Sequence, residues 1–124
     1  ALPAPNTFGP IPLNLFMAPG DVSKEEMLSS TSRGLWVTRF HYVNVVHPLK
    51  AVLTGMTRDG TFWIEGGEIA YPVKNLRFTQ GILEALSHVE QIGRQLALQK
   101  AWLGATVVPA LKITSFNFTG ATEF

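Results

Sequence analysis

The run LWVTRFHYVNVV at residues 35–46 constrains the fold most strongly. It is dense in β-branched and aromatic residues, which suit the pleated surface of a sheet. Because apolar side chains occupy both alternating faces, we predict a long strand in the middle of a sheet, covered on both sides. Pro48 ends this strand, since proline cannot donate a ladder hydrogen bond.

The next stretch, GMTRDGTFWIEGGEI at residues 55–69, supplies neighbouring strands. Asp59-Gly60 and Gly66-Gly67 are both two-residue turn signals, and strand-forming residues lie between them. The prediction is a three-stranded meander with two tight hairpins. Its facing pairs are predicted to be Met56 with Trp63, Thr57 with Phe62, Ile64 with Ile69, and Phe62 with Tyr71.

The two faces of this meander have different predicted roles. One face is expected to lie in the core and carries Phe62, Ile64, Ile69 and Tyr71. The other face carries three apolar residues that another element or subunit is expected to cover, namely Met56, Trp63 and Ala70. This second face is a candidate interface.

Residues 1–20 are apolar but rich in proline, at positions 3, 5, 10, 12 and 19. Proline interrupts helices, so the segment cannot form a signal helix or a membrane span, and we predict an extended arm. Leu15 and Phe16 belong to this arm and need a surface to cover them. They join the candidate interface.

Residues 21–124 are predicted to form a single domain. Ser23 and Glu26 have the spacing of a capping box, which predicts a short helix after them. Apolar residues recur at helical spacing in residues 80–96, with Gly93 placed for close approach to a neighbour, so this segment is the predicted main helix.

The last segment, residues 107–118, alternates like a strand and shifts parity near Ser115, which suggests a bulge. The predicted fold class is therefore α+β. It consists of a mostly antiparallel β-sheet or barrel-like meander, one main amphipathic helix and the extended N-terminal arm.

Composition excludes several kinds of function. Only 15% of the residues are charged and the formal net charge is +1, which argues against nucleic acid as a partner. Basic and aromatic residues alternate at residues 39–42 and 77–78 as in single-strand binders, but a half-buried strand gives this pattern more often. The chain has no cysteine, which excludes thiolate metal sites and favours a cytoplasmic location.

Two carboxylates are candidates for paired chemistry. Glu65 and Glu68 flank the Gly66-Gly67 turn, and a tight hairpin would place their β-carbons about 5 Å apart. The same arrangement is common at exposed hairpin tips, where charges have little effect. We favour the solvated tip.

The histidines and serines are scattered. His41 and His47 would lie about 20 Å apart on one strand, too far to share a metal ion, and His88 lies beside Glu84 on the polar side of the predicted helix. No HExxH, Gly-x-Ser-x-Gly or phosphate-binding glycine motif occurs. No catalytic residue and no metal ligand is therefore assigned in this chain.

Several stretches occur in a characteristic order: NLFMAPGD, RGLWVTRF, GMTRDGTFWIEGGEIAYPVKNLRFTQ, ILEALSHVEQIG and VVPALKITSFNFTG. In this order they resemble the C-terminal part of the TldD/PmbA family, whose members are described as peptidases of the U62 type and as modulators of DNA gyrase. The resemblance covers residues 14–120. Its most specific part matches the family pattern at Gly60, Ile64, Glu65, Gly67, Glu68, Ile69, Pro72, Val73 and Lys74.

The resemblance implies a cytoplasmic protein of peptide processing, whose active members are zinc metallopeptidases that work as pairs of related subunits. In those members the zinc histidines come from an HExxxH helix upstream of the matched region, and a cysteine ligand comes from a glycine-rich loop. The corresponding segment, residues 93–106, is short and has no cysteine, and the usual Asp-Pro step is His47-Pro48. No catalytic or metal residue carries over, so zinc would belong to the full-length parent or a partner subunit.

Three hypotheses follow. The first is a domain, incomplete on its own, that scaffolds, dimerises and lines a peptide-binding cavity together with a missing N-terminal half or a related subunit, in a homo- or hetero-oligomer. The second is that the intact parent is a metallopeptidase whose zinc ligands lie outside this chain. The third is a stand-alone module that captures peptides at a sheet edge. None of them involves nucleic acid or a membrane.

Overall fold

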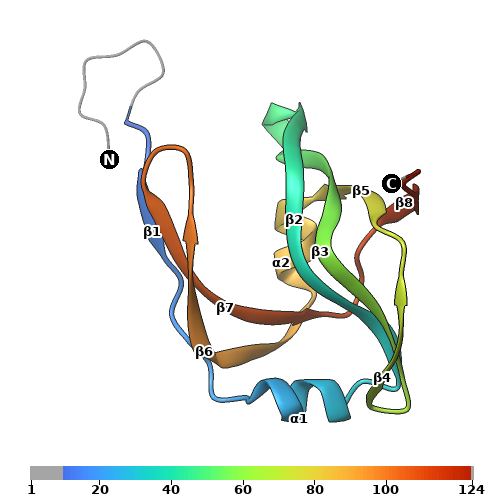
Figure 1. Ribbon diagram of the computed structural model, residues 1–124. Coiled ribbons are helices and arrows are strands. Elements are labelled where there is room, and N and C mark those ends of the chain that lie inside the picture. The colour runs from blue at the N-terminus through green and yellow to red at the C-terminus, as the bar shows by residue number, and fades with distance from the viewer. Residues whose placement is uncertain (1–9, 124) are drawn as a thin grey trace.

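The computed structural model describes residues 10–123, which form two β-sheets and two short α-helices (Figure 1). Nearly all strand pairs are antiparallel, so the prediction of a mostly antiparallel α+β fold is confirmed. Of the two predicted forms of the meander, the barrel-like one is wrong, because the strands divide into an open sheet of five and a sheet of three. The elements are β1 (Asn14–Phe16), α1 (Lys24–Ser29), β2 (Arg33–His47), the 3₁₀ helix η1 (Pro48–Lys50), β3 (Val52–Glu65), β4 (Glu68–Val73), β5 (Leu76–Gly81), α2 (Ile82–Ser87), β6 (Val89–Lys100), β7 (Ala105–Ile113) and β8 (Phe118–Ala121).

The five-stranded sheet has the order β2-β3-β5-β8, with β4 also paired to β3. The long strand β2 is confirmed, and Pro48 begins η1 directly after it. Its predicted central position is wrong, because β2 lies at the edge of the sheet within residues 10–123. Val45 and Val46 in its second half are 62% and 56% exposed, so the two apolar faces of this half are not covered by the described residues.

The strand β3 runs unbroken through Asp59 and Gly60, so the predicted first hairpin is wrong. Both residues have positive φ, 62° and 115°, and they lie where the register between β2 and β3 shifts. They form a β-bulge, which inserts an extra residue and bends the strand without reversing it. Met56 consequently lies opposite His41 rather than opposite Trp63.

The Gly66-Gly67 turn does reverse the chain, as predicted, and Ile64 lies opposite Ile69. A register shift then places Trp63 opposite Tyr71, where Phe62 was expected. The predicted core residues of this ribbon differ in burial: Ile64 is buried, Phe62 is half-buried, and Ile69 and Tyr71 are exposed.

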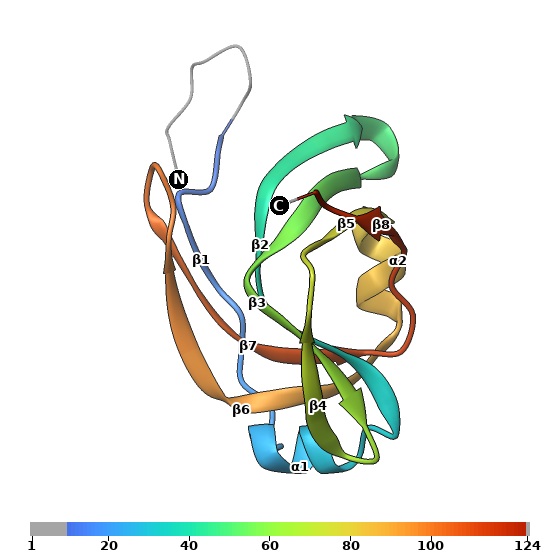
Figure 2. The ribbon, with the colours of Figure 1, turned by 45° about the vertical axis from the view of Figure 1, so that its right-hand side comes forward.

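The three-stranded sheet contains a long β6–β7 hairpin, along which β1 lies parallel to β7 (Figures 1 and 2). The predicted helix at residues 80–96 is wrong beyond Ser87, where α2 ends and β6 soon begins. Pairing with β7 prevails over the helical spacing, because tertiary contacts override weak local preferences. The close approach predicted at Gly93 is confirmed, since a β-carbon there would lie 3.3 Å from the carbonyl oxygen of Ala110 in β7.

The helix α1 connects the two sheets. It begins at the predicted cap, where the Ser23 hydroxyl accepts a hydrogen bond from the Glu26 amide at 3.1 Å, and Met27 on its inner side is buried. Just before the helix, the Gly20 amide donates to the Gly93 carbonyl of β6 at 2.9 Å. The start of the domain is therefore fastened to the three-stranded sheet.

The core of the five-stranded sheet is built around Phe78, which is only 2% exposed. Its ring lies 4.6 Å from that of Phe40 and 5.4 Å from that of Phe116, measured between ring centroids. Thr57 and Thr61 are also fully buried and hydrogen bond to each other at 2.7 Å. The core thus combines an aromatic cluster with a small polar network.

Residues 1–9 of the predicted arm lie outside the described residues, whereas its later part contributes β1. The parity shift near Ser115 is a change of sheet rather than a bulge, because β7 ends at Ile113 and β8 begins at Phe118 in the other sheet. Within residues 10–123, no helix is long and apolar enough to cross a membrane.

Candidate functional site

The facing carboxylates lie where the sequence predicts them. Glu65 and Glu68 are direct partners at the end of the β3–β4 hairpin, and both are exposed. The turn between them packs against α1, since a β-carbon on Gly67 would lie 2.7 Å from the carbonyl oxygen of Ser29. Gly67 also has φ of +78°, so this family-pattern glycine serves the turn and its contact with the helix. The geometry matches a solvated tip built on a packed turn.

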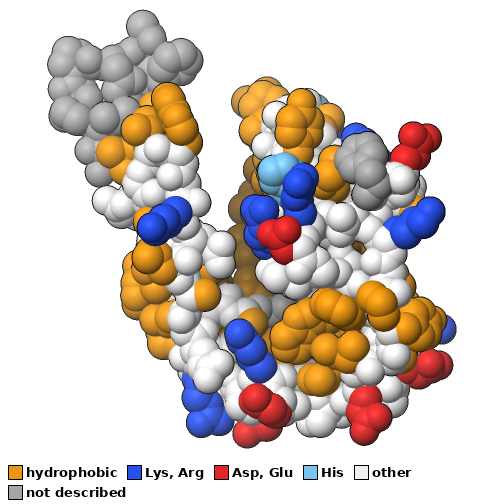
Figure 3. All heavy atoms as spheres, in the orientation of Figure 1, with side chains coloured by type: hydrophobic (Ala, Val, Ile, Leu, Met, Phe, Trp, Pro, Cys, Tyr) orange, Lys and Arg blue, Asp and Glu red, His pale blue; other side chains and the backbone are white. Residues whose placement is uncertain are grey.

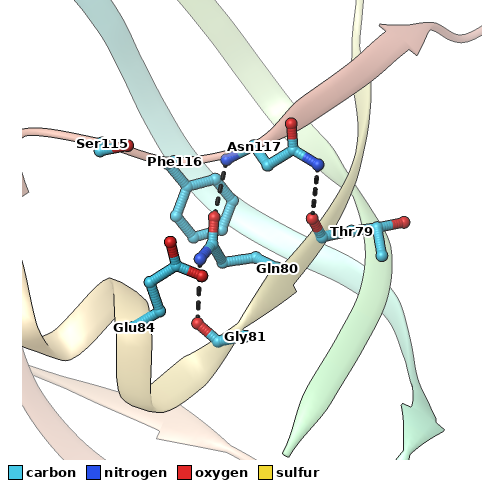
Figure 4. Close-up of a pocket in the computed structure, with 7 residues that line it drawn as sticks. All are labelled: Thr79, Gln80, Gly81, Glu84, Ser115, Phe116 and Asn117. Carbon is cyan, nitrogen blue, oxygen red and sulfur yellow. Dashed lines mark hydrogen bonds between the residues drawn. The ribbon is translucent and has the colours of Figure 1, made fainter.

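A shallow pocket of about 350 Å³ lies where β5 and α2 meet the segment between β7 and β8 (Figure 4). Its lining is mainly polar and consists of Thr79, Gln80, Gly81, Glu84, Ser115, Phe116 and Asn117.

The polar groups of this pocket hold the two segments together. The side-chain oxygen of Gln80 accepts a hydrogen bond from the Asn117 amide at 2.7 Å, and its nitrogen donates to the Gly81 carbonyl at 3.0 Å. The Asn117 side chain donates to the Thr79 carbonyl at 3.0 Å (Figure 4). Because these groups are already satisfied, the pocket joins β5 to the chain that leads into β8, and its lining contains no histidine to activate Ser115.

The histidines are separated and support the local backbone. The His47 ring nitrogen accepts a hydrogen bond from the Lys50 amide at 3.3 Å, which caps η1. The His88 ring contacts the main-chain carbonyl of Glu84 at 2.8 Å rather than its carboxylate. Among residues 10–123, no three histidine, aspartate or glutamate side chains gather in a way that could hold a metal ion. Zinc, which the family implies, does not fit these residues.

A second pocket, of about 230 Å³, lies on the outer face of the β2–β3 ribbon and is lined by His41, Tyr42, Met56 and Arg58. We call it the Arg58 pocket. The basic and aromatic residues at 39–42 are visible in the sequence, but their proximity to Arg58 is not, because Asp59 and Gly60 predict a turn where the structure has a bulge. The alternation of Met56 and Arg58 along one strand was the available signal.

Asp59 lies beside this pocket and forms an ion pair with Arg39. The hydrogen bond from the Arg39 guanidinium is the main cause that holds the pKa of the Asp59 carboxyl below its usual range. Desolvation opposes this shift, while the charges of Arg39, Arg58 and His41 add to it. The local field at this face is therefore positive.

The predicted interface residues lie on both sheets. Met56 and Trp63 of β3 are half-buried, while Ala70 of β4 is exposed. Leu15 and Phe16 of β1 are 54% and 66% exposed.

Both long hairpins also end in bare apolar residues, which the sequence did not single out. Leu49 in the β2–β3 hairpin is 95% exposed, and Trp102 in the β6–β7 hairpin is 94% exposed. The two hairpins stand apart with an open cleft between them, as Figure 3 shows. Further exposed apolar residues accompany each of them, namely Val45 and Val46 in the first hairpin and Leu98 and Leu103 in the second. Groups of exposed apolar residues commonly mark surfaces that contact other proteins, whereas single ones do not.

A family model and a curated relative both match this chain. The model of the PmbA/TldA metallopeptidase C-terminal domain matches residues 4–120. A protein named "Metalloprotease" from Methanothermobacter thermautotrophicus is 29% identical over 91 residues, which cover 73% of this chain and 20% of that protein.

Solved structures support the same fold. TldE from Thermococcus kodakarensis has a TM-score of 0.72 at 16% identity, with 85% of this chain and 23% of that chain covered. A Thermotoga maritima protein provisionally assigned as a modulator of a DNA gyrase has a TM-score of 0.71 at 22% identity, with 91% of this chain and 25% of that chain covered. The chain thus spans between a fifth and a quarter of the length of these relatives. With its family model matched over nearly the whole sequence, the chain belongs to the family of PmbA/TldA metallopeptidase C-terminal domains.

Proposed function

We propose that this chain is the scaffolding part of a larger cytoplasmic protein of peptide processing, without catalytic ligands of its own. In this role it holds the remaining part of the protein, or a related subunit, and lines one side of a peptide-binding cavity. The observation that carries the proposal is that the ends of both long hairpins expose apolar residues, on a chain that spans only 20% to 25% of the length of its relatives.

The apolar surface supports a role in assembly. Leu49 and Trp102 lie at the two hairpin ends, and Leu15 and Phe16 lie on the strand beside the second hairpin. Large aromatic residues at such places are the usual centres of binding energy in interfaces. The predicted interface residues Met56, Trp63 and Ala70 belong to this proposal as well.

The peptidase activity of the family belongs, in this proposal, to residues outside the chain. The absence of a fitting ligand set within residues 10–123 supports this division. Zinc content by atomic absorption and peptidase activity, measured on this polypeptide alone, would overturn it if a stoichiometric metal and hydrolysis were found together. Reading the complete reading frame for an upstream HExxxH then separates a metallopeptidase parent from a metal-free partner subunit.

The assembly role is tested in the full-length protein with Trp102→Ser. We expect this variant to weaken subunit or domain contact by about 2 kcal/mol, or about 30-fold in an affinity, because an interface tryptophan loses its buried area. Sedimentation measures the subunit affinity, and hydrogen exchange reports whether the amides of the β6–β7 hairpin are protected.

Leu83→Ser is the matched control for the β6–β7 hairpin, since Leu83 is 72% exposed on α2, and α2 begins beside the other hairpin, where the Ile82 amide donates to the Ala51 carbonyl at 3.0 Å. It should leave both measurements unchanged. A hairpin that exchanges freely in the full-length protein, together with equal behaviour of the two variants, would contradict the assembly role. It would favour the stand-alone peptide-binding module instead, which needs no covering partner.

A further inference from the structure

The outer face of the five-stranded sheet gathers basic side chains around the Arg58 pocket. Strand pairing places His41 opposite Met56, and Met56 opposite Arg77 on its other side. One step along the ribbon, Arg39 lies opposite Arg58. Three strands thus bring three arginines and a histidine to one face, over β2, where Figure 3 shows basic side chains beside a histidine at the edge of the cleft.

The positive charge on this face is only partly balanced. Asp59 is paired with Arg39, and within residues 10–123 no carboxylate forms an ion pair with Arg58 or Arg77. Like charges directly opposite each other on neighbouring strands destabilise a sheet. The facing Arg39 and Arg58 therefore favour the binding of an anionic group between them. Asp59 supplies one negative charge, which balances only part of the positive charge on this face.

Two of the four residues that line the pocket supply apolar surface. Met56 and Tyr42 line it together with His41 and Arg58, and the ring of Tyr42 lies 6.5 Å from that of His41. Tyr42 has a φ of 53°, which is unusual for an aromatic residue and occurs at a register shift in β2. Such strained positions concentrate at functional sites, where a bulge re-aims a side chain.

We propose that the Arg58 pocket binds the C-terminal end of a peptide, with Arg58 and Arg77 holding the terminal carboxylate and Met56 and Tyr42 contacting an apolar last side chain. The volume of about 230 Å³ is smaller than pockets for drug-sized ligands and suits one residue. Guanidinium groups bind carboxylates through short, charge-assisted hydrogen bonds. The rest of the peptide would extend into the cleft between the hairpins.

The aromatic residues argue against single-stranded nucleic acid at this face. Bases need exposed rings on which to stack. Phe40, although 41% exposed, packs with Phe78 and Phe116 on the opposite face of the sheet. Of the phenylalanine and tyrosine rings of these motifs, only that of Tyr42 therefore lies at the pocket.

This inference rests on the proposed function, because its ligand is a peptide.

The test uses the full-length protein and a fluorescein-labelled hexapeptide ending in leucine, prepared with either a free C-terminal carboxylate or a C-terminal amide. Fluorescence anisotropy should show the free acid binding about tenfold more tightly or better, which is the range of a charge-assisted contact. Arg58→Gln and Arg77→Gln should each reduce that preference, and Arg58→Lys should restore part of it, because it keeps the charge but not the planar fork.

Arg94→Gln is the matched control, because Arg94 is an exposed arginine on β6 that pairs with Glu26 instead. Arg58 and Arg77 are exposed, so their variants should fold, which circular dichroism verifies. Equal binding of acid and amide by the wild-type protein would overturn the proposal, as would competition by a single-stranded oligonucleotide that depends on Arg58. Either result leaves the assembly role standing, since that role is measured at Trp102.

Discussion

The buried threonine pair gives the sharpest test of how the five-stranded sheet is held together. The Thr57 hydroxyl accepts hydrogen bonds from the Thr61 hydroxyl at 2.7 Å and from the Leu76 amide at 2.9 Å. Asn75, whose side chain lies 3.4 Å from the Thr61 hydroxyl, precedes β5. This network therefore fixes the start of β5 against the bent strand β3.

Thr57→Val should destabilise the chain by about 2 to 4 kcal/mol. The substitution keeps the side-chain shape but leaves the buried Leu76 amide without an acceptor, which costs about 1 to 3 kcal/mol. It also removes the shorter of the two hydrogen bonds of Thr61, worth about 1 kcal/mol more. Thr57 is 0% exposed, so water cannot replace the lost acceptor.

Urea unfolding followed by tryptophan fluorescence measures this loss. With a urea m-value of about 2 kcal/mol/M, the midpoint should fall by about 1 to 2 M. Thr61→Val is the matched control, because it removes one donor but leaves Leu76 bound to Thr57, and it should cost about 1 kcal/mol. A Thr57→Val variant within about 0.5 kcal/mol of wild type, or less destabilised than Thr61→Val, would refute the role of the network.

Two further predictions concern the same sheet. Gly55→Ala should destabilise by about 1 to 3 kcal/mol in the same urea assay, because the new β-carbon would lie 2.9 Å from the packed ring of Phe78. Gly66→Ala, where no atom lies within 4 Å but φ is +59°, should cost only about 1 kcal/mol, and a larger loss there than at Gly55 would contradict the packing argument. Asp59 has a lowered pKa in the folded state, so its contribution to stability is present above its ordinary pKa and is lost as the pH falls through the folded pKa. Asp59→Asn should therefore reduce the loss of stability at acidic pH, measured as the free energy of unfolding against pH. Because the ion pair with Arg39 is exposed, 1 M salt should have a similar effect on the wild type. If the variant and the wild type lose the same stability at acidic pH, the ion pair is unimportant.

The parts of the candidate sites that sequence reasoning found are those that depend on a few adjacent residues. The Glu65 and Glu68 pair was predictable because two consecutive glycines can form only a short list of turns. The Ser23 cap was predictable for the same reason, since its hydroxyl reaches an amide three residues away. The Arg58 pocket was not found, because its residues come from separate strands whose register depends on a bulge.

Two of the wrong predictions, a turn at Asp59-Gly60 and a helix that continues beyond Ser87, share one physical cause. A short sequence pattern is compatible with more than one local structure, and contacts with distant strands select between them. Asp59 and Gly60 supply positive φ for a turn or for a bulge, and the pairing of β2 with β3 on both sides of them selects the bulge. Residues 89–96 carry apolar side chains at helical spacing, and the hydrogen bonds offered by β7 make them a strand.

By itself, the sequence determined the strand-rich α+β class, the long strand β2, the α1 cap, the Gly66-Gly67 turn and the family resemblance, because each depends on local conformational preference or on an ordered motif. Only the tertiary structure decided that the strands divide into two sheets, that β2 lies at an edge, and that His41, Arg58 and Arg77 share one face. The reason is that strand register and sheet order are set by contacts between distant residues, and the energy of those contacts exceeds the weak preferences of any single segment.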